Sequence, residues 1–343
     1  MNISHDAERE NYLRWDRKPG HYEVYYLTFN HLKSESGFWI RYTMTAPDAD
    51  KGDAYAQIWF SYFNRRDPEK NFALKKKYPI DQLNAKENPF SLSVGENSLR
   101  NGHAVGSIAG NGHSAAWDIT FTPSAGVHYM LPKFMYKTEL ADTLALVPHL
   151  DVKFSGSINV DGDTLSFDGD PGCQTHLWGS EHAQRWAWAH CNAFEEDDSA
   201  VIECLSAQVK RLGIMIPPMN MFFIRAGGRD YLLTELNKLI FTKSEFDCGD
   251  WTFSSTDGNT KFKGKFSCRM DDLVEAEYFD PNGHKAYCRN TEVGDLTLEI
   301  YSRSSILAPW RLDKTLSARG TAHMEFASRA RDPRVKKEIV EAV

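Results

Sequence analysis

Between Arg185 and Phe194 large and small side chains alternate strictly, which is the two-residue period of a β-strand. One face would carry Trp186, Trp188, His190, Asn192 and Phe194, and the other Ala187, Ala189, Cys191 and Ala193. The small face lets another backbone approach closely. The large face either packs against a core or lines a cavity whose rings hold an apolar ligand while its polar residues orient it. The pattern itself leaves both interpretations open.

Short strands separated by turns are predicted along most of the chain. The strand segments are residues 37–44, 55–63, 115–121, 152–160, 164–167, 201–209, 221–225, 231–235 and 321–326. Turns such as Asp161-Gly162 and Gly227-Gly228 join neighbouring strands into hairpins. Helical periodicity is almost absent, although Asp332 and Pro333 predict the cap and first turn of a short helix that runs to the C-terminus. The pattern predicts an all-β protein built from antiparallel barrels or sandwiches.

The chain of 343 residues is long for a single core, which favours two domains. We expect residues 1–178 and 179–343, because turn residues at Asp170-Pro171-Gly172 precede the alternating segment. The net charge of −7, without a basic stripe, excludes nucleic acid as a partner. Oligomeric state has no signature in the sequence.

We expect neither a secretory signal nor a membrane span. The N-terminal residues are polar and lack the apolar segment of a secretory signal, and no run approaches the ~18 apolar residues of a membrane span. The six cysteines are scattered without a C-x-x-C pair, which indicates reduced thiols and a cytoplasmic protein and argues against a zinc site. The spacing of the cysteines neither predicts nor excludes a disulfide. The cysteines are Cys173, Cys191, Cys204, Cys248, Cys268 and Cys288.

The alternating segment also carries a resemblance to a known family. The pattern Trp178-Gly179, a short gap, then Arg185-Trp186-x-Trp188-x-x-Cys191-Asn192-x-Phe194 resembles a motif of tocopherol cyclases, carotenoid 1,2-hydratases (hydroxyneurosporene synthases) and AttH-like proteins. Weaker agreement extends it over roughly residues 20–330. The supporting segments are 23–26, 37–42, 117–119 and 156–169. The chain departs from cyclase-type sequences at Glu181-His182, where they tend to have Gly and Pro.

The resemblance implies two tandem lipocalin-like (calycin-like) β-barrel domains with a hydrophobic pocket between or within them. It also implies cofactor-free chemistry on polyprenyl or other lipophilic substrates. In cyclases and hydratases of this type, a protein acid protonates a trisubstituted alkene, and a phenol or water captures the cation. Fungal lipocalin-like pericyclic cyclases are similar at greater distance.

Protonation of an alkene requires an acid that stays neutral in a dry pocket, and rings that stabilise a cation. The catalytic candidates are His176, Asp118, His190 and Glu181. Each has a plainer structural interpretation. Asp118, opposite Trp117 on its strand, could be a solvated carboxylate. Glu181 could share a proton with His182 or form an exposed loop pair. The histidines could be satisfied hydrogen-bonding groups. Glu195 opens an acidic run that is typical of a turn.

The substrate-binding candidates are the aromatic and polar side chains of the same segment together with one methionine. They are Trp178, Trp186, Trp188, Asn192, Arg185 and Met219. Arg185 could instead stack on a ring or pair with a buried carboxylate across the domain junction. Met219 belongs to the apolar, proline-broken stretch 211–221, which suits a lid or pocket wall as well as a buried loop.

We expect neither a metal nor a cofactor. His176, Glu181, His182 and His190 offer metal ligands, but their spacing matches no compact cage. Three functions remain in competition. The first is an acid/base cyclase, hydratase or isomerase for a terpenoid or polyketide-derived molecule. The second is a carrier of a hydrophobic metabolite, and the third a scaffold with filled barrels. The expected partner is a small hydrophobic molecule, with peripheral membrane contact for its uptake.

Overall fold

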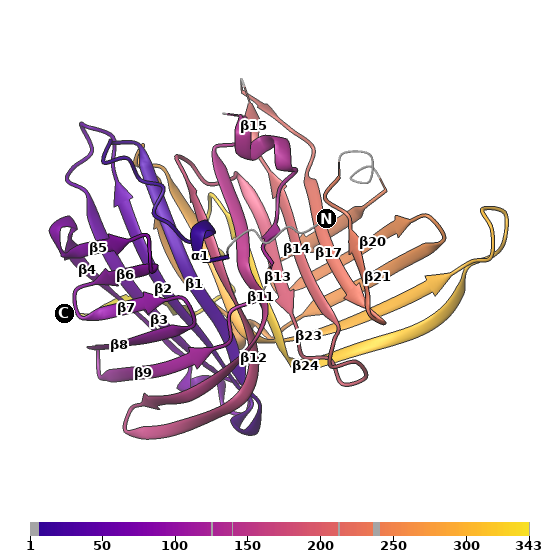
Figure 1. Cartoon of the computed structure of the whole chain (residues 1–343), viewed down its shortest axis with the longest axis horizontal. Coiled ribbons are helices and arrows are strands. Elements are labelled where there is room, and N and C mark those ends of the chain that lie inside the picture. Colours follow the sequence, from indigo (N-terminus) through magenta and orange to yellow (C-terminus); the bar gives the residue numbers. More distant parts are fainter. Residues whose placement is uncertain (1–6, 125, 139, 212, 236–240, 343) are drawn as a thin grey trace.

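Two antiparallel sheets, each curled around a core, make up most of the molecule (Figure 1). The computed structural model describes residues 7–124, 126–138, 140–211, 213–235 and 241–342. The all-β prediction is confirmed. Outside the sheets lie α1 (Ala7–Glu10), the hairpin β15 (Lys210–Arg211) and β16 (Ile214–Met215), and 3-10 turns at Leu32–Ser34, Pro68–Lys70, Ile80–Gln82, Lys133–Lys137 and Met270–Asp272.

The first sheet is formed almost entirely by the N-terminal half of the chain. Its strands, in spatial order, are β26 (Val340–Glu341), β4 (Phe72–Pro79), β3 (Tyr55–Asn64), β2 (Ser36–Ala46), β1 (His21–His31), β12 (Asp163–Gly179), β11 (Thr143–Val160), β9 (His113–Phe121), β8 (His103–Gly110), β7 (Asn97–Arg100), β6 (Ser91–Val94) and β5 (Leu83–Lys86). A short strand, β10 (His128–Tyr129), pairs with β11.

The second sheet is formed by the C-terminal half. Its strands, in spatial order, are β18 (Arg229–Leu232), β17 (Met219–Ala226), β14 (Val201–Gln208), β13 (Arg185–Cys191), β24 (Arg311–Ser328), β23 (Lys285–Ser302), β21 (Thr260–Ser267), β20 (Asp250–Asp257) and β19 (Lys243–Asp247). β22 (Val274–Phe279) pairs with β23 and with β25 (Lys337–Glu338). The chain passes from the first sheet to the second between Gly179, where β12 ends, and Arg185, where β13 begins. The division into domains at residue 178 stays a prediction.

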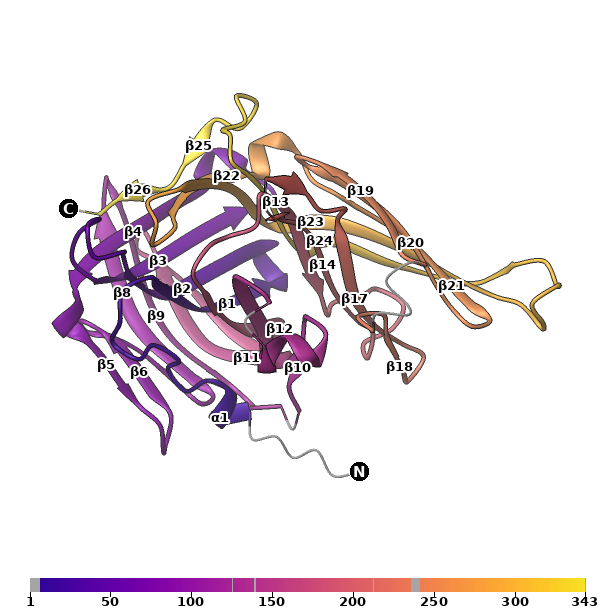
Figure 2. The same cartoon turned by 90° about the horizontal axis from the view of Figure 1, so that it is seen from above.

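Ring contacts between strands that are not neighbours show that each sheet curls. In the first sheet Phe60 of β3 stacks on Trp117 of β9, with ring centroids 5.7 Å apart. In the second, Phe222 of β17 meets Phe253 of β20 edge to face at 4.8 Å. Each curled sheet therefore encloses a core of its own. Seen from above, β19 to β21 extend away from the first sheet (Figure 2).

A third core lies where the two sheets face each other, and the alternating segment explains how it forms. Trp186 and Trp188 of β13 point into this inter-sheet core, together with Trp39 and Trp59 of the first sheet. The small residues Ala187, Ala189 and Cys191 instead face the interior of the second sheet. Phe194 also packs there, because β13 ends at Cys191 and the alternation stops with it.

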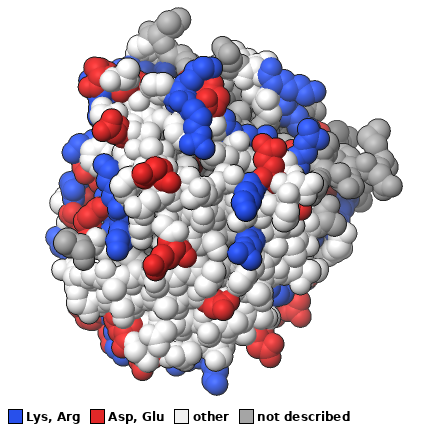
Figure 3. Space-filling model, turned by 60° about the vertical axis from the view of Figure 1, so that its left-hand side comes forward, with Lys and Arg blue, Asp and Glu red and all other residues white. Residues whose placement is uncertain are grey.

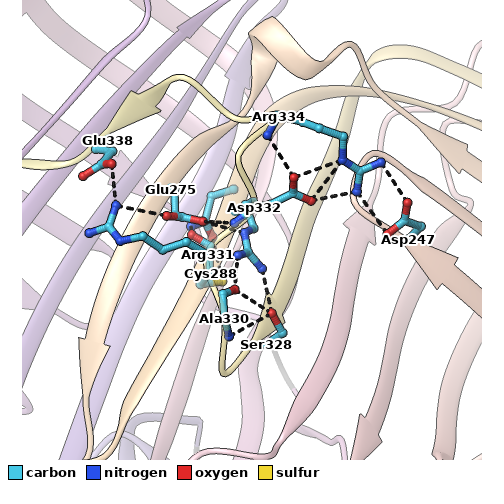
Figure 4. Close-up of polar contacts among 11 residues, drawn as sticks. Asp247, Glu275, Cys288, Ser328, Ala330, Arg331, Asp332, Arg334 and Glu338 are labelled. Carbon is cyan, nitrogen blue, oxygen red and sulfur yellow. Dashed lines mark hydrogen bonds and ion pairs between the residues drawn. The ribbon is translucent and has the colours of Figure 1, made fainter.

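The predicted C-terminal helix is wrong. Asp332 and Pro333 do start a turn, closed by Val335 N donating to Asp332 O at 3.1 Å. Beyond it β25 pairs with β22 and β26 pairs with β4, both in parallel, so this segment joins the two sheets. A helix of this length is only marginally stable by itself, whereas the strand edges present unpaired N–H and C=O groups to which the segment can bond. Figure 4 shows the ion pairs that fix the segment, including Arg334 between Asp332 and Asp247.

The sequence predicts a surface without a basic stripe, and reduced thiols. On the face shown in Figure 3, Lys and Arg side chains lie among Asp and Glu side chains, without a patch of one sign. All six cysteines are free thiols. Within the described parts of the chain, none of the helices has the length and apolar character that crossing a bilayer requires.

Candidate functional site

A cavity of about 290 Å³ lies within the inter-sheet core. Its aromatic walls come from both sheets and comprise Tyr26, Trp39, Trp186, Trp188 and Tyr278. Met130, Met135, Met219 and Met221 add flexible thioether surface. The volume is at the lower end of the range for small-molecule sites, and the mostly apolar lining with a few polar groups is their usual composition.

Arg41 is a buried cation in this cavity wall. Its guanidinium carbon lies 5.4, 4.9 and 4.3 Å from the ring centroids of Trp39, Trp59 and Tyr278. The residue is only 6% exposed. Among the described residues, its Nε has no hydrogen-bond partner. The three ring faces stabilise the charge without using up the guanidinium donors, which leaves Arg41 able to bind an oxygen of a ligand.

Glu325 is the buried acid of the cavity. It lies on β24 directly opposite Trp188 of β13, so both side chains project from the same face toward the first sheet. The Cys288 thiol lies 3.6 Å from its Oε2. Burial raises the pKa of the Glu325 carboxyl, and the charge of Arg41 opposes this only in part. Glu325 thus has the main property required of a general acid in a dry site.

His182 lines the cavity from the loop between the sheets. Its ring stacks between Tyr22 and Trp186, with centroid distances of 4.4 and 5.4 Å. His182 Nδ1 lies 2.5 Å from Asp280 Oδ1, and Arg329 Nη1 donates to Asp280 Oδ2 at 2.6 Å. Burial lowers the pKa of His182 although Asp280 opposes it, which favours a neutral ring held in one orientation.

Of the four catalytic candidates predicted from the sequence, one, Glu181, lines the cavity. Its Oε1 lies 2.9 Å from His284 Nδ1. Asp118 lies outside: its side chain is 70% exposed and pairs with His103, because it points away from the core that Trp117 enters. A catalytic role for Asp118 therefore finds no support.

The two histidine candidates are buried but lie outside the cavity lining. His176 Nδ1 lies 2.7 Å from Glu10 O, and its Nε2 lies 2.8 Å from Glu23 Oε1. Both ring nitrogens of His176 are therefore engaged, which makes it a structural hydrogen-bonding group. The His190 ring stacks with Trp188, with ring centroids 6.5 Å apart, and its Nδ1 lies 2.9 Å from Glu203 Oε2.

The six substrate-binding candidates divide evenly. Trp186, Trp188 and Met219 line the cavity. The other three lie elsewhere. Trp178 lies under the Arg14 guanidinium at 5.1 Å, and Arg185 stacks on Phe246 at 4.1 Å.

Asn192 links the two sheets and lies outside the cavity lining. Its Nδ2 donates to Gly172 O at 3.0 Å and to Asp151 Oδ1 at 2.9 Å, both in the first sheet. In the stretch 211–221, Leu212 and the Arg211 side chain lie outside the described residues, while Ile216 and Met221 line the cavity.

Sequence reasoning missed Arg41, Glu325 and His182 as site residues. Arg41 had a weak signal, since it shares a strand face with Trp39 two residues earlier. Glu325 had none, because nothing local places β24 beside β13. His182 was considered as a proton-sharing partner of Glu181 and as a metal ligand of unsuitable spacing, but not as a residue of the cavity.

Comparison with known proteins agrees with the architecture. The tocopherol cyclase-like family model matches residues 20–324. The uncharacterized protein Rv0493c of Mycobacterium tuberculosis is 24% identical over 317 residues, covering 92% of this chain and 89% of that protein. Its similarity adds a relative without assigning an activity.

Two solved structures share the fold. AttH (NE1406) from Nitrosomonas europaea has a TM-score of 0.55 at 13% identity, covering 90% of this chain and 92% of its own. Kievitone hydratase from Nectria haematococca has a TM-score of 0.50 at 12% identity, covering 91% and 90%. These likenesses concern the fold alone. The family resemblance and the tandem lipocalin-like fold predicted from the sequence are confirmed.

Proposed function

Because this chain belongs to the tocopherol cyclase-like family, we propose that it is a cofactor-independent enzyme that protonates an alkene of a lipophilic substrate between its two sheets. The observation that carries the proposal is the position of Glu325, a buried carboxyl with a raised pKa, among the aromatic walls of the cavity. A purely apolar lining would instead favour a carrier, and a molecule without a cavity would favour a scaffold.

The substrate would be bound by its apolar body and oriented by one oxygen. Trp186, Trp188 and Tyr26 offer ring faces to the hydrocarbon part. Arg41 supplies the polar contact, since an oxygen acceptor on the substrate would satisfy its unpaired Nε. A prenylated phenol or a related terpenoid or polyketide has both parts.

The reaction begins when the Glu325 carboxyl donates its proton to one alkene carbon. This leaves a Glu325 carboxylate and a cation at the more substituted carbon, which the tryptophan faces stabilise. A water molecule or a hydroxyl of the substrate then forms the new C–O bond, and the proton that this oxygen loses returns to Glu325. Hydration consumes one water molecule, whereas cyclisation is an isomerisation. The Glu325 carboxyl therefore acts first as a general acid and then, as a carboxylate, as a general base.

Access for a lipophilic molecule is supported by apolar groups at the surface of the same segments. Leu140 lines the cavity and is 60% exposed, and Ile214, close in sequence to the lining residue Ile216, is 68% exposed. Uptake from a membrane surface by these residues, in a cytoplasmic setting, forms part of the proposal.

The test compares the Glu325→Gln variant with the wild type on a panel of prenylated phenols in D₂O. The wild type should produce a hydrated or cyclised product with one deuterium on the protonated carbon. Loss of a general acid should lower turnover about 10²- to 10⁴-fold. Binding of the fluorescent probe N-phenyl-1-naphthylamine should stay unchanged, because the substitution keeps the shape of the cavity.

The matched control is Glu195→Gln, since Glu195 is a surface carboxylate, 48% exposed and paired with Arg319. It should keep wild-type turnover. Equal turnover by Glu325→Gln and the wild type would exclude Glu325 as the acid. Probe binding without conversion of any phenol in the panel would favour the carrier.

A further inference from the structure

Beside the cavity, three buried side chains bring metal-binding atoms together. Cys173 Sγ and one ring nitrogen each of His190 and His323 all lie within 4.8 Å of one another. Each of the three residues is fully buried. Cys173 belongs to β12 of the first sheet, whereas His190 and His323 face each other across β13 and β24 of the second. The cluster therefore lies on the seam between the sheets.

Each of the two histidines has one ring nitrogen in a hydrogen bond and one without. His190 Nδ1 lies 2.9 Å from Glu203 Oε2, and His323 Nε2 lies 2.9 Å from Asn30 Oδ1. Within the described residues, the remaining nitrogens, His190 Nε2 and His323 Nδ1, have no hydrogen-bond partner. An N–H held by a carboxylate or amide oxygen with the other nitrogen free is the arrangement of metal-binding histidines. Unpaired buried nitrogens are otherwise costly.

Glu292 provides a fourth candidate ligand. Its Oε2 lies 3.6 Å from His323 Nδ1, and among the described residues this oxygen has no hydrogen-bond partner. The carboxyl is 1% exposed. The Thr28 hydroxyl lies 3.2 Å from Cys173 Sγ and can donate to it. One sulfur, two imidazole nitrogens and one carboxylate oxygen form a donor set that suits zinc.

We propose that Cys173, His190, His323 and Glu292 bind one Zn²⁺ ion that holds the two sheets together. A thiolate and a carboxylate balance the two charges of the ion, which lowers the cost of burying it. Zinc ligands in a tetrahedral site lie about 3.3–3.8 Å apart. The three clustered atoms therefore need to close in by about 1 Å, and the Glu292 carboxylate, which is near His323 but outside the 4.8 Å cluster, must turn toward them. The site is structural, since none of its four ligands lines the cavity.

A nucleophilic role for Cys173 with His190 and Glu203 fits the structure less well. A substrate would have to reach a thiol that is fully buried, and such a role leaves His323 Nδ1 and Glu292 Oε2 without a function. The zinc site uses all of these atoms. It also connects to the cavity wall, because Glu203 accepts hydrogen bonds from both Trp188 Nε1, at 2.5 Å, and His190.

The test uses the full chain, dialysed free of metal and then titrated with Co²⁺ as a spectroscopic substitute for Zn²⁺. We expect one ion per chain, a thiolate-to-Co²⁺ charge-transfer band with tetrahedral d–d bands, and displacement of Co²⁺ by Zn²⁺. Zinc in excess should raise the unfolding temperature, because it binds only the folded chain. Cys173→Ser and His323→Gln should abolish the charge-transfer band.

Two further variants separate ligand loss from misfolding. Cys204→Ser removes another fully buried thiol, outside the cluster, and should keep the band. Glu203→Gln keeps the volume of the residue that orients His190, and should weaken Co²⁺ binding about 10- to 100-fold. A folded wild-type chain without the band, or a band and zinc stoichiometry unchanged in Cys173→Ser, would overturn the proposal. Either readout is independent of catalytic activity.

Discussion

At the scale of single residues, buried polar groups fall into two kinds in this protein. Glu23 has several partners: the backbone N–H groups of Arg14 and Trp15, the Tyr25 hydroxyl and the His176 ring. Glu325 and Arg41 have few, and both line the cavity. Groups with many partners fix the fold, whereas groups with few partners beside a cavity are available to a ligand.

Glu23 should make the stability of the fold depend on acid pH. Burial acts to raise its pKa, but hydrogen bonds from His176, His21 and Tyr25 outweigh burial and lower the pKa to about 2, from 4.5. Its contribution is therefore complete above about pH 4.5 and is lost as the pH falls toward 2. Urea unfolding of Glu23→Gln should show lower stability at pH 7 and a flatter loss between these limits.

The exposed control Glu195→Gln should follow the wild type over the same range. An equally steep loss in Glu23→Gln and the wild type would mean that other carboxyls cause the acid sensitivity.

The sequence predicts residues of the site only where the local pattern fixes a face. The alternation places Trp186 and Trp188 together, and both line the cavity. It cannot distinguish His190, which is buried outside the cavity lining, from a side chain that reaches the cavity. Glu325 is beyond local reasoning, because its neighbour Trp188 lies on a strand that only the tertiary fold brings alongside.

At the scale of elements, β2 and β23 are in close contact across the two sheets. A Cβ added at Gly37 of β2 would lie 2.4 Å from Glu292 Cβ and 2.5 Å from Glu292 O. Next to it, Asn30 Nδ2 of β1 donates to the same Glu292 O at 2.7 Å. The backbone of β2 at Gly37 thus packs directly against Glu292 of β23, and position 37 has no space for a larger residue.

Gly37→Ala should therefore destabilise the chain. Overpacking of a well-packed contact costs about 1–3 kcal/mol, and calorimetry should record a lower unfolding temperature. The control is Gly126→Ala, because a Cβ there meets nothing within 4 Å. Equal unfolding temperatures for Gly37→Ala and Gly126→Ala would contradict this account of the contact.

Local sequence specifies most of the strands, whereas distant parts of the chain decide the structure of the C-terminal segment. A hairpin such as β11–β12 is specified by its own alternation and by the Asp161-Gly162 turn. The segment after Asp332 has a genuine helix-start signal, yet its structure is decided by distant edges. Ile339 N donates to Glu275 O of the second sheet at 2.9 Å, and Ala342 N donates to Lys75 O of the first sheet at 2.7 Å.

At the scale of the whole molecule, both barrel-like interiors are filled by their own side chains, and the cavity described here lies between the sheets. Each half therefore supplies part of the site: Arg41 comes from the first sheet and Glu325 from the second. This arrangement could be inferred from the sequence only as a family expectation, since the pairing of two curled sheets has no local signature.

Titration with N-phenyl-1-naphthylamine shows whether the inter-sheet cavity binds an apolar ligand. Ala207 lines the cavity from β14, whereas Ala116 is exposed on the outside of β9. We expect one probe molecule bound per wild-type chain, and we expect Ala207→Phe to weaken binding at least about tenfold (about 1.4 kcal/mol). Ala116→Phe should bind like the wild type. Equal affinity of the folded Ala207→Phe variant and the wild type would contradict the account.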